Sequence, residues 1–213
     1  MIPDLDQDPA DFWETLYHDR RQDASVWGAR VNPILTEVAA GLTEGAALDL
    51  GCGAGGDTMW LARRGWRVTA VDISATAVEQ VRRLAREAGL DEAISAERHD
   101  LADTFPDGTF DLVSAQYFHT PFALPRATIL RAAAQALRPG GRLLVVDHGS
   151  IAPWSWNQDH STHIPDPAEV HAELDLPPAW TVERADRPER EATGPDGRTA
   201  TVTDNVLLIR RAV

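Results

Sequence analysis

Short apolar runs alternate with amphipathic stretches through the middle of the chain. Each run is bounded by glycine, aspartate or other turn residues, as buried strands are, and apolar residues recur at helical spacing between the runs. This alternation predicts βαβ crossovers and a parallel sheet with helices on both faces. The predicted strands are residues 46–50, 67–71, 94–99, 110–115 and 142–146, and the predicted helices are residues 56–64, 74–87 and 129–137, the last stopped by residues 138–141.

The segments on either side of this core have a different pattern. Asn32 followed by Pro33 is typical of a capped helix start, and a Gly-Pro-Asp-Gly turn at residues 194–197 lies between two strand-like stretches. A hairpin at this place would close an open sheet with an antiparallel strand. The predicted flanking elements are helices at residues 11–19, 33–40 and 168–174 and strands at residues 180–187 and 199–210.

Composition and charge narrow the class of protein. The chain has 213 residues, 43% of them hydrophobic, which fits one globular domain. Its formal net charge of -13 would repel nucleic acid phosphates and anionic lipids, so we expect neither nucleic acid nor membrane as a partner. All 20 residues counted as lysine or arginine are arginine, which excludes lysine chemistry. A single cysteine excludes an intrachain disulfide, and without a leader peptide or a long apolar run we expect a cytoplasmic protein.

A glycine-rich loop follows the first predicted strand and opens a predicted helix. Residues 48–56 read LDLGCGAGG, in which the glycines permit a sharp turn and close approach of a ligand to the backbone, while the helix start offers N–H donors. Asp72 lies 21 residues after Gly51, at the end of the second strand. A carboxylate there can accept both hydroxyls of an adenosine ribose. The pattern predicts an adenosine ligand; a tight turn without a ligand is the alternative.

The carboxylate of Asp49 favours one adenosine ligand over another. Gly51, Gly53 and Gly56 also satisfy the dinucleotide fingerprint, but Asp49 would repel a pyrophosphate, and the loop has no arginine to compensate. The same carboxylate suits the ammonium and sulfonium of S-adenosyl-L-methionine. Two alternatives use the same loop. A nicotinamide-dependent oxidoreductase would be stabilised by the dinucleotide, and a non-catalytic adenosine-ligand-binding protein would bind without turnover.

Three motifs identify a family. LDLGCGAGGDT, VTAVDIS and LRPGGRLLVV, in this order, resemble the first, second and fifth-strand motifs of the class I S-adenosylmethionine-dependent methyltransferases. The resemblance covers about residues 46–147. It implies a Rossmann-like, doubly wound α/β sheet of seven strands, mostly parallel with one antiparallel C-terminal strand. It also implies one domain over residues 1–213, with an N-terminal helical lid at 1–44, a cofactor-binding core at 45–148, and an acceptor loop and closing strands at 149–213.

The resemblance further implies which residues meet the cofactor, position by position. Gly51, Cys52 and Gly53 would line its methionine part, and Asp72 would bind the ribose. Ile73, Asp100 and Leu101 would contact the adenine, and Gln116 would lie near the sulfonium and amino-acid end. Two of these have a structural alternative: Asp100 fits a turn cap, and Cys52 fits a small packed loop residue rather than a nucleophile.

A narrower resemblance involves the two ends of the chain. Trp27-Gly28-Ala29-Arg30, the short length and the GPDGR turn resemble small methyltransferases of the tellurite-resistance and thiopurine type, which act on soft sulfur, selenium or tellurium acceptors. Trp27 and Arg30 would then belong to the lid and reach the cofactor carboxylate. The chain departs from the tellurite-type pattern just before the turn, where Glu191 and Ala192 replace a His-Arg pair.

The acceptor is expected beyond the fourth and fifth strands, where open α/β sheets bind ligands. His119 is the first candidate for a base or acceptor-orienting group, because histidine titrates near neutrality, and a capping or solvent-facing role is its alternative. His148, directly after Asp147, is the second candidate. For methyl transfer to a small-molecule acceptor, these residues would complete an in-line displacement. The remaining polar cluster, Asp159, His160 and His163, fits a solvated loop better than zinc ligands, and we expect no metal site.

Overall fold

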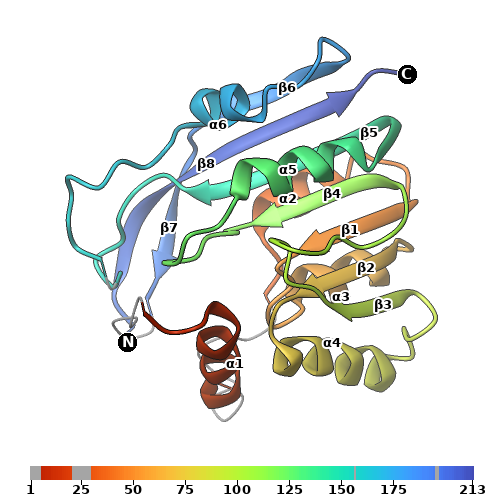
Figure 1. The fold of residues 1–213 in the computed structure, drawn as a ribbon, viewed down its shortest axis with the longest axis horizontal. Coiled ribbons are helices and arrows are strands. Elements are labelled where there is room, and N and C mark those ends of the chain that lie inside the picture. The colour runs from red at the N-terminus through yellow and green to blue at the C-terminus, as the bar shows by residue number, and fades with distance from the viewer. Residues whose placement is uncertain (1–5, 21–29, 156, 195–196) are drawn as a thin grey trace.

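Eight strands form the centre of the molecule, in the order β3-β2-β1-β4-β5-β8-β6, with β7 pairing the start of β8 (Figure 1). This computed structural model describes residues 6–20, 30–155, 157–194 and 197–213. Strands β1 to β5 pair in parallel, and β8 is antiparallel to both β5 and β6. The predicted mostly parallel sheet with an antiparallel C-terminal strand is confirmed. The strands are β1 Ala46–Leu50, β2 Arg67–Asp72, β3 Ile94–Arg98, β4 Phe110–Gln116, β5 Leu137–His148, β6 Trp180–Asp186, β7 Glu189–Thr193 and β8 Thr199–Arg211.

The sheet has one strand more than the predicted seven. The additional strand is β7, which pairs along its whole length with the first five residues of β8, from Glu189 with Thr203 to Thr193 with Thr199. This is possible because β8 is 13 residues long and only its later part pairs with β5 and β6. The sequence of β7 is EREAT, which has no apolar alternation to reveal a strand.

The helices follow their predicted caps. Asn32 Oδ1 accepts a hydrogen bond from Ile34 N at the start of α2, and Ser74 Oγ accepts one from Ala77 N at the start of α4. Of the described helices, none is long and apolar enough to cross a membrane. Their bounds are α1 Pro9–Arg20, α2 Pro33–Ala39, α3 Gly56–Arg63, α4 Ala75–Ala88, α5 Arg126–Gln135 and α6 Pro167–Leu174.

The end of α5 differs from the prediction. The helix ends at Gln135, and the residues predicted to stop it belong to β5, which begins at Leu137. Leu137 is fully buried and pairs with Phe110 of β4, so the strand begins before Pro139 and continues past it with a register shift in β4. The burial of Leu137 therefore sets the boundary between α5 and β5, although the Pro-Gly-Gly sequence at residues 139–141 favours a turn.

Helices cover both faces of the sheet, and neighbouring residues of β1 show the division. Ala47 belongs to the core cluster that packs with residues of α2, α3 and α4, whereas Leu48 and Leu50 belong to the cluster with residues of α5 and α6. Figure 1 shows α1 apart from these layers, at the edge of the sheet toward which β1 and β4 point. The strand order reverses between β1 and β4, which is where open α/β sheets form a binding crevice.

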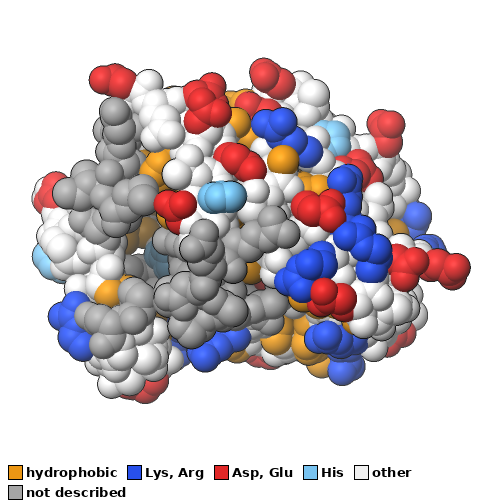
Figure 2. Space-filling model, turned by 90° about the horizontal axis from the view of Figure 1, so that it is seen from below, with side chains coloured by type: hydrophobic (Ala, Val, Ile, Leu, Met, Phe, Trp, Pro, Cys, Tyr) orange, Lys and Arg blue, Asp and Glu red, His pale blue; other side chains and the backbone are white. Residues whose placement is uncertain are grey.

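Acidic and basic side chains are interspersed on the face of the molecule that is seen from below. Figure 2 shows arginines on this face next to acidic side chains rather than in an unbroken basic patch. On α4, Arg83 pairs with Glu87 at 2.7 Å and Arg86 pairs with Glu79 at 2.8 Å. These exposed i,i+4 and longer-range pairs neutralise the arginines locally.

Candidate functional site

The glycine loop between β1 and α3 is covered closely by side chains from other elements. Gly51, Gly53 and Gly55 have φ angles of 68°, 50° and 86°, in the left-handed region that favours glycine. A Cβ at Gly51 would lie 3.0 Å from the Phe118 ring, and a Cβ at Gly53 would lie 2.8 Å from the Tyr17 hydroxyl. Both glycines are therefore needed for the close approach as well as for the turn.

Asp72 stands at the end of β2 with its carboxylate fixed by two backbone groups. Oδ2 accepts a hydrogen bond from Gly53 N and Oδ1 accepts one from Ser74 N, both at 3.0 Å. The side chain is buried, and burial raises the pKa of Asp72 to about 6. Each carboxylate oxygen keeps a lone pair for a further donor, as recognition of a ribose requires.

Two more carboxylates, one buried and one half-buried, lie behind the glycine loop. Asp49 of β1 accepts a hydrogen bond from Thr58 Oγ1 at 2.6 Å, and Asp57 of α3 accepts one from Asn32 N at 2.6 Å. Burial and the charge of Asp57 raise the pKa of Asp49 to about 7, and burial raises the pKa of Asp57 to about 6. Such a site favours a cationic ligand, because a cation stabilises the ionised form of each carboxyl group.

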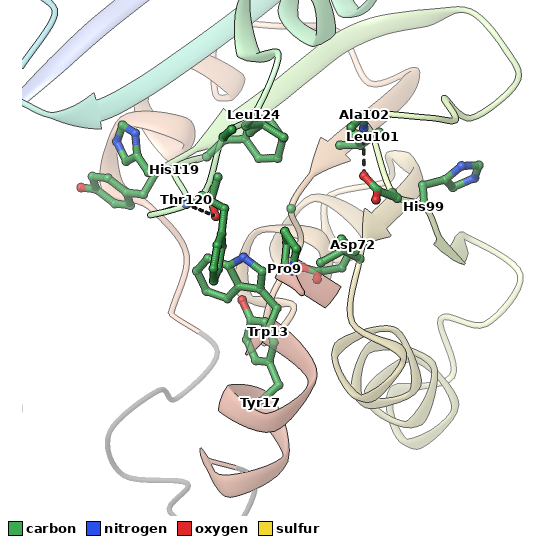
Figure 3. A pocket seen from close by; sticks show the side chains of 17 residues that line it. Pro9, Trp13, Tyr17, Asp72, His99, Leu101, Ala102, His119, Thr120 and Leu124 are labelled. Carbon is green, nitrogen blue, oxygen red and sulfur yellow. Dashed lines mark hydrogen bonds between the residues drawn. The ribbon is translucent and has the colours of Figure 1, made fainter. Parts of the chain in front are cut away.

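A pocket opens in front of this loop, at the carboxyl edge of the sheet (Figure 3). It encloses about 810 Å³, counting the part of its mouth that is open to solvent. None of the described residues that line it is an arginine. In Figure 3, Asp72 and Leu101 lie to one side of Trp13, and His119 lies to the other. The lining comes from the strand ends (Gly51, Asp72, Ile73, residues 99–102), from α1 (Pro9, Trp13, Tyr17) and from the segment after β4 (residues 117–120 and 122–124).

Three stacked rings mark the side of the pocket away from Asp72. The Tyr117 and His148 rings stack with centroids 4.3 Å apart, and the His148 and His119 rings stack at 5.6 Å. Tyr117 has a φ angle of 50°, in the left-handed region that is unusual for a residue with a side chain, and such residues cluster at functional sites. This strained residue directly follows β4.

The Tyr117 hydroxyl is held by two residues far away in sequence. It donates to Asp204 Oδ1 at 2.9 Å and accepts from Arg190 Nη2 at 2.9 Å, while Arg190 Nε donates to Asp204 Oδ2 at 2.6 Å. Asp204 lies on β8 and is buried, and Arg190 lies on β7. The strand that the sequence did not reveal thus carries one of the groups that fix Tyr117.

His119 faces the buried carboxylate of Asp147. Its Nε2 lies 3.4 Å from Asp147 Oδ1, and Arg126 Nη2 donates to both oxygens of the same carboxylate at 2.7 and 2.6 Å. Burial and the positive charge of Arg126 lower the pKa of His119, and burial and His119 lower the pKa of His148. Both rings are therefore neutral at physiological pH.

Comparison with known proteins agrees with this geometry. Residues 47–141 match the family model described as a methyltransferase domain. The match extends over less than half of the chain and agrees with the resemblance to class I S-adenosylmethionine-dependent methyltransferases that the motifs indicate. The methyltransferase match spans β1 to the first part of β5, which includes the glycine loop, Asp72 and Asp100.

The curated relatives of this chain differ in the molecules that their names give. It is 37% identical over 107 residues to methyltransferase GfsG of Streptomyces halstedii, covering 47% of this chain and 36% of that protein. It is 34% identical over 142 residues to 27-O-demethylrifamycin SV methyltransferase of Amycolatopsis mediterranei, covering 63% and 51%. A third relative, ribosomal RNA small subunit methyltransferase C of Alcanivorax borkumensis, is 32% identical over 123 residues, covering 56% and 37%. The chain thus spans about half or less of the length of these relatives.

Solved structures share the fold of this protein over nearly the whole chain. A protein described for the conversion of a disulfide bond into a thioacetal group during echinomycin biosynthesis has a TM-score of 0.70 and 24% identity, covering 95% of this chain and 93% of that one. TehB from Haemophilus influenzae has a TM-score of 0.69 and 17% identity, covering 93% and 67%. At these identities the likeness is one of fold.

The structure brings together six of the residues predicted for the methyltransferase site. Asp100 is exposed, and its Oδ1 accepts a hydrogen bond from Ala102 N at 3.0 Å, so it caps a turn at the rim of the pocket. Both interpretations of Asp100 are compatible with this position. The six that line the pocket are Gly51, Asp72, Ile73, Asp100, Leu101 and His119.

The other predicted residues lie behind or outside the pocket lining. Gln116 donates through Nε2 to Ser114 Oγ at 2.8 Å, and its buried Oε1 has no hydrogen-bond partner in the described part of the chain. Burial and the charges of Asp72 and Asp49 raise the pKa of Cys52, which keeps it a neutral thiol. Arg30 is exposed, and Trp27 lies outside the described residues. Asp49, Gly53 and His148 support the lining residues through the contacts given above.

Several residues of the site carry no signal in the sequence. Tyr117 is two residues before His119, so its position after β4 could be predicted. Its partners Arg190 and Asp204 are far away in the sequence, and their contacts with Tyr117 could not be predicted. The same holds for α1, whose Trp13 and Tyr17 line the pocket. The helical pattern of residues 11–19 and the lid implied by the resemblance indicated this helix, but not that these two side chains line the pocket.

Proposed function

We propose that this protein transfers the methyl group of S-adenosylmethionine to a small-molecule acceptor by in-line displacement. The observation that carries the proposal is the set of three carboxylates around the glycine loop, the buried Asp49 and Asp72 and the half-buried Asp57, beside a pocket whose described lining has no arginine. A dinucleotide would bring a pyrophosphate to this place, where three carboxylates oppose it. A sulfonium and an ammonium fit it.

The residues that would hold the cofactor are those at the strand ends. Asp72 would bind the ribose hydroxyls, Ile73 and Leu101 would cover the adenine, and Asp100 would bind its amino group. The unpartnered Oε1 of Gln116 supports a role as acceptor for the ammonium, since a buried oxygen without a partner costs free energy. When bound, S-adenosylmethionine supplies an electrophilic methyl carbon.

The acceptor would lie on the side of the pocket that His119 forms. His119 Nε2 lies 3.4 Å from Asp147 Oδ1 and also accepts a hydrogen bond of 3.4 Å from His148 N. With the proton on Nε2, the Nδ1 lone pair would be available to take a proton from a hydroxyl or thiol; with the proton on Nδ1, the ring would donate to the acceptor and orient it. Arg126 holds the Asp147 carboxylate in place, and Tyr117 holds His148 against His119. This arrangement of base and orienting carboxylate supports an acceptor that carries a proton.

The charge of the chain supports a small molecule over ribosomal RNA. With a net charge of -13 the protein repels phosphate backbones, and the arginines of α4 are paired with acidic neighbours. Relatives named for rifamycin and for ribosomal RNA both match, so their names do not choose between these acceptors. The soft acceptors implied by the tellurite-type resemblance form one class to test.

The decisive experiment is a turnover screen that measures release of S-adenosylhomocysteine. Thiols, selenite, tellurite, halides, phenols and amines are offered with S-adenosylmethionine, and a His119→Gln variant serves as the matched control. We expect release with one class of acceptor and a lower rate for the variant if that acceptor carries a proton. If S-adenosylhomocysteine fails to raise the melting temperature while a nicotinamide dinucleotide raises it, the proposal is wrong.

A further inference from the structure

Tyr17 is a residue of α1, and its hydroxyl faces the backbone of the glycine loop. A Cβ built on Gly53 would lie 2.8 Å from Tyr17 Oη and 3.6 Å from Cζ, so the phenol end stands directly over this residue. The ring stacks on Trp13 with centroids 6.1 Å apart, and both rings line the pocket. The hydroxyl therefore borders the space where the methionyl end of the proposed cofactor would lie.

A carboxylate in this space meets few free donors on the loop itself. The amide of Cys52 donates to Val71 O, that of Gly53 to Asp72 Oδ2, and that of Gly55 to Cys52 O. The cofactor carboxylate would also lie in the field of the acidic groups behind the loop. No arginine is among the described residues that line the pocket, and Arg30 is exposed outside it. A neutral hydroxyl donor can bind the carboxylate here without forming an ion pair with Asp49 or Asp72.

Helix α1 is anchored one turn before Tyr17. Glu14 Oε2 accepts hydrogen bonds from Ser74 Oγ at 2.7 Å and Thr76 N at 3.1 Å, and Glu14 Oε1 accepts one from Thr76 Oγ1 at 2.5 Å. The Phe12 ring adds an edge contact with Phe122, with centroids 5.1 Å apart. These contacts fix the helix on both sides of the pocket, so the Tyr17 hydroxyl is positioned before a ligand arrives.

We propose that Tyr17 binds the methionyl carboxylate of the cofactor by donating a hydrogen bond from its hydroxyl. The inference rests on the proposed function, and it assigns to α1 the recognition of the amino-acid end. Asp72 distinguishes an adenosine from other ligands. Tyr17 would distinguish a complete S-adenosyl amino acid from an adenosine thioether without the carboxylate.

The test is the Tyr17→Phe variant, which removes one oxygen atom and keeps the ring. Calorimetry measures its affinity for S-adenosylhomocysteine, for decarboxylated S-adenosylmethionine and for 5′-methylthioadenosine. Hydrogen bonds to charged groups predict a loss of about 10-fold to 100-fold for S-adenosylhomocysteine. The other two ligands lack the carboxylate, and their affinities should stay within about twofold. Thr15→Val, which removes a hydroxyl from the exposed side of the same helix, is the matched control and should change none of the three.

Each outcome decides the matter. Selective loss for S-adenosylhomocysteine supports the proposal. An equal loss for all three ligands would show that the hydroxyl acts through packing of α1, and an unchanged affinity for S-adenosylhomocysteine would show that the carboxylate binds elsewhere; both overturn it. If the wild-type protein binds none of the three, the proposed function fails and this inference fails with it.

Discussion

The amide of Gly53 donates a hydrogen bond of 3.0 Å to Oδ2 of Asp72, which joins the glycine loop to the end of β2. Ser74 N binds the other oxygen, and the Ser74 hydroxyl donates to Glu14 of α1. The ribose-binding candidate, the loop and the covering helix are thus linked through a few hydrogen bonds. A change at one of them is expected to affect ligand binding at the others.

Replacement of Asp72 by alanine should weaken cofactor binding in a folded protein. The carboxylate would lose its contacts with the ribose, at about 1.5–3 kcal/mol for each charge-assisted hydrogen bond, and the Gly53 amide would lose its partner. Calorimetry with S-adenosylhomocysteine measures the change. Asp103→Ala, an exposed carboxylate near Asp100, is the control and should bind as the wild type does. Equal affinity in Asp72→Ala would remove the ribose assignment.

Gly53→Val should abolish cofactor binding and leave the sheet folded. A valine would have to adopt a φ of 50°, and its Cβ would meet the Tyr17 hydroxyl at 2.8 Å, so the loop or α1 must move. We expect a cost to stability of about 1–3 kcal/mol and no heat of binding with S-adenosylhomocysteine. Circular dichroism checks the fold. Gly41→Val is the matched control, since its nearest atom is Val38 O at 3.8 Å. Retained binding would mean that the loop is only a turn.

Affinity for S-adenosylmethionine should rise with pH between about 5 and 8. Burial raises the pKa of Asp49 to about 7 and those of Asp57 and Asp72 to about 6, and a cation binds the ionised forms better, so binding releases protons. Asp49→Asn retains an acceptor for Thr58 and loses the charge. It should flatten the profile near pH 7, as calorimetry in buffers of different ionisation enthalpy would show. A variant with the wild-type profile would exclude Asp49 as the source.

Without ligand, the same carboxyl groups make the free energy of unfolding decrease as the pH rises. They bind protons more tightly in the folded than in the unfolded state, so this contribution to the free energy of unfolding is present at low pH. It is lost as the pH rises through about 6 to 7. The difference between wild type and Asp49→Asn in urea unfolding, measured across this range, isolates the part due to Asp49. A difference that does not vary with pH would contradict the raised pKa.

Removal of the charge of Glu14 should loosen α1 and accelerate cofactor release. Glu14→Gln keeps the shape but weakens three hydrogen bonds from Ser74 and Thr76. Stopped-flow measurement of S-adenosylhomocysteine dissociation should show a rate increase of about tenfold, from a loss of about 1–2 kcal/mol. Asp11→Asn, an exposed carboxylate of the same helix, is the control. Equal rates in both variants would show that the Glu14 contacts do not hold the helix over the pocket.

Hydrogen exchange tests the lid prediction directly. Residues of α1 line the pocket, so their amides should gain protection when S-adenosylhomocysteine binds. The predicted acceptor loop that follows β5 is the second segment to measure; its Trp154 packs against Gly194, where a Cβ would lie 2.5 Å from the indole. If exchange in both segments is the same with and without saturating ligand, they are permanent packing rather than a lid.

The core of the fold was predictable because its signals are local. The strand runs, the Asn32 and Ser74 caps and the glycine loop depend on neighbouring residues, and each occurs where predicted. Strand β7 was not predicted although the turn of residues 194–197 was, since its residues have no apolar period. The grouping of Tyr117 with Arg190 and Asp204 joins residues 73 and 87 positions apart, a distance at which a single sequence carries no pairing signal. The Tyr17 hydroxyl over Gly53 is missed for the same reason.

The buried position of Cys52 makes this protein convenient for site-specific labelling. It is the single cysteine of the chain, its side chain is buried, and its pKa is raised, so maleimides and other thiolate-directed reagents should find little reactive sulfur in the native state. A fluorophore or spin label can then be attached to a cysteine introduced on the surface of α1 without first removing the native thiol. Distance measurements between α1 and the sheet become possible on a protein whose cofactor loop is unaltered.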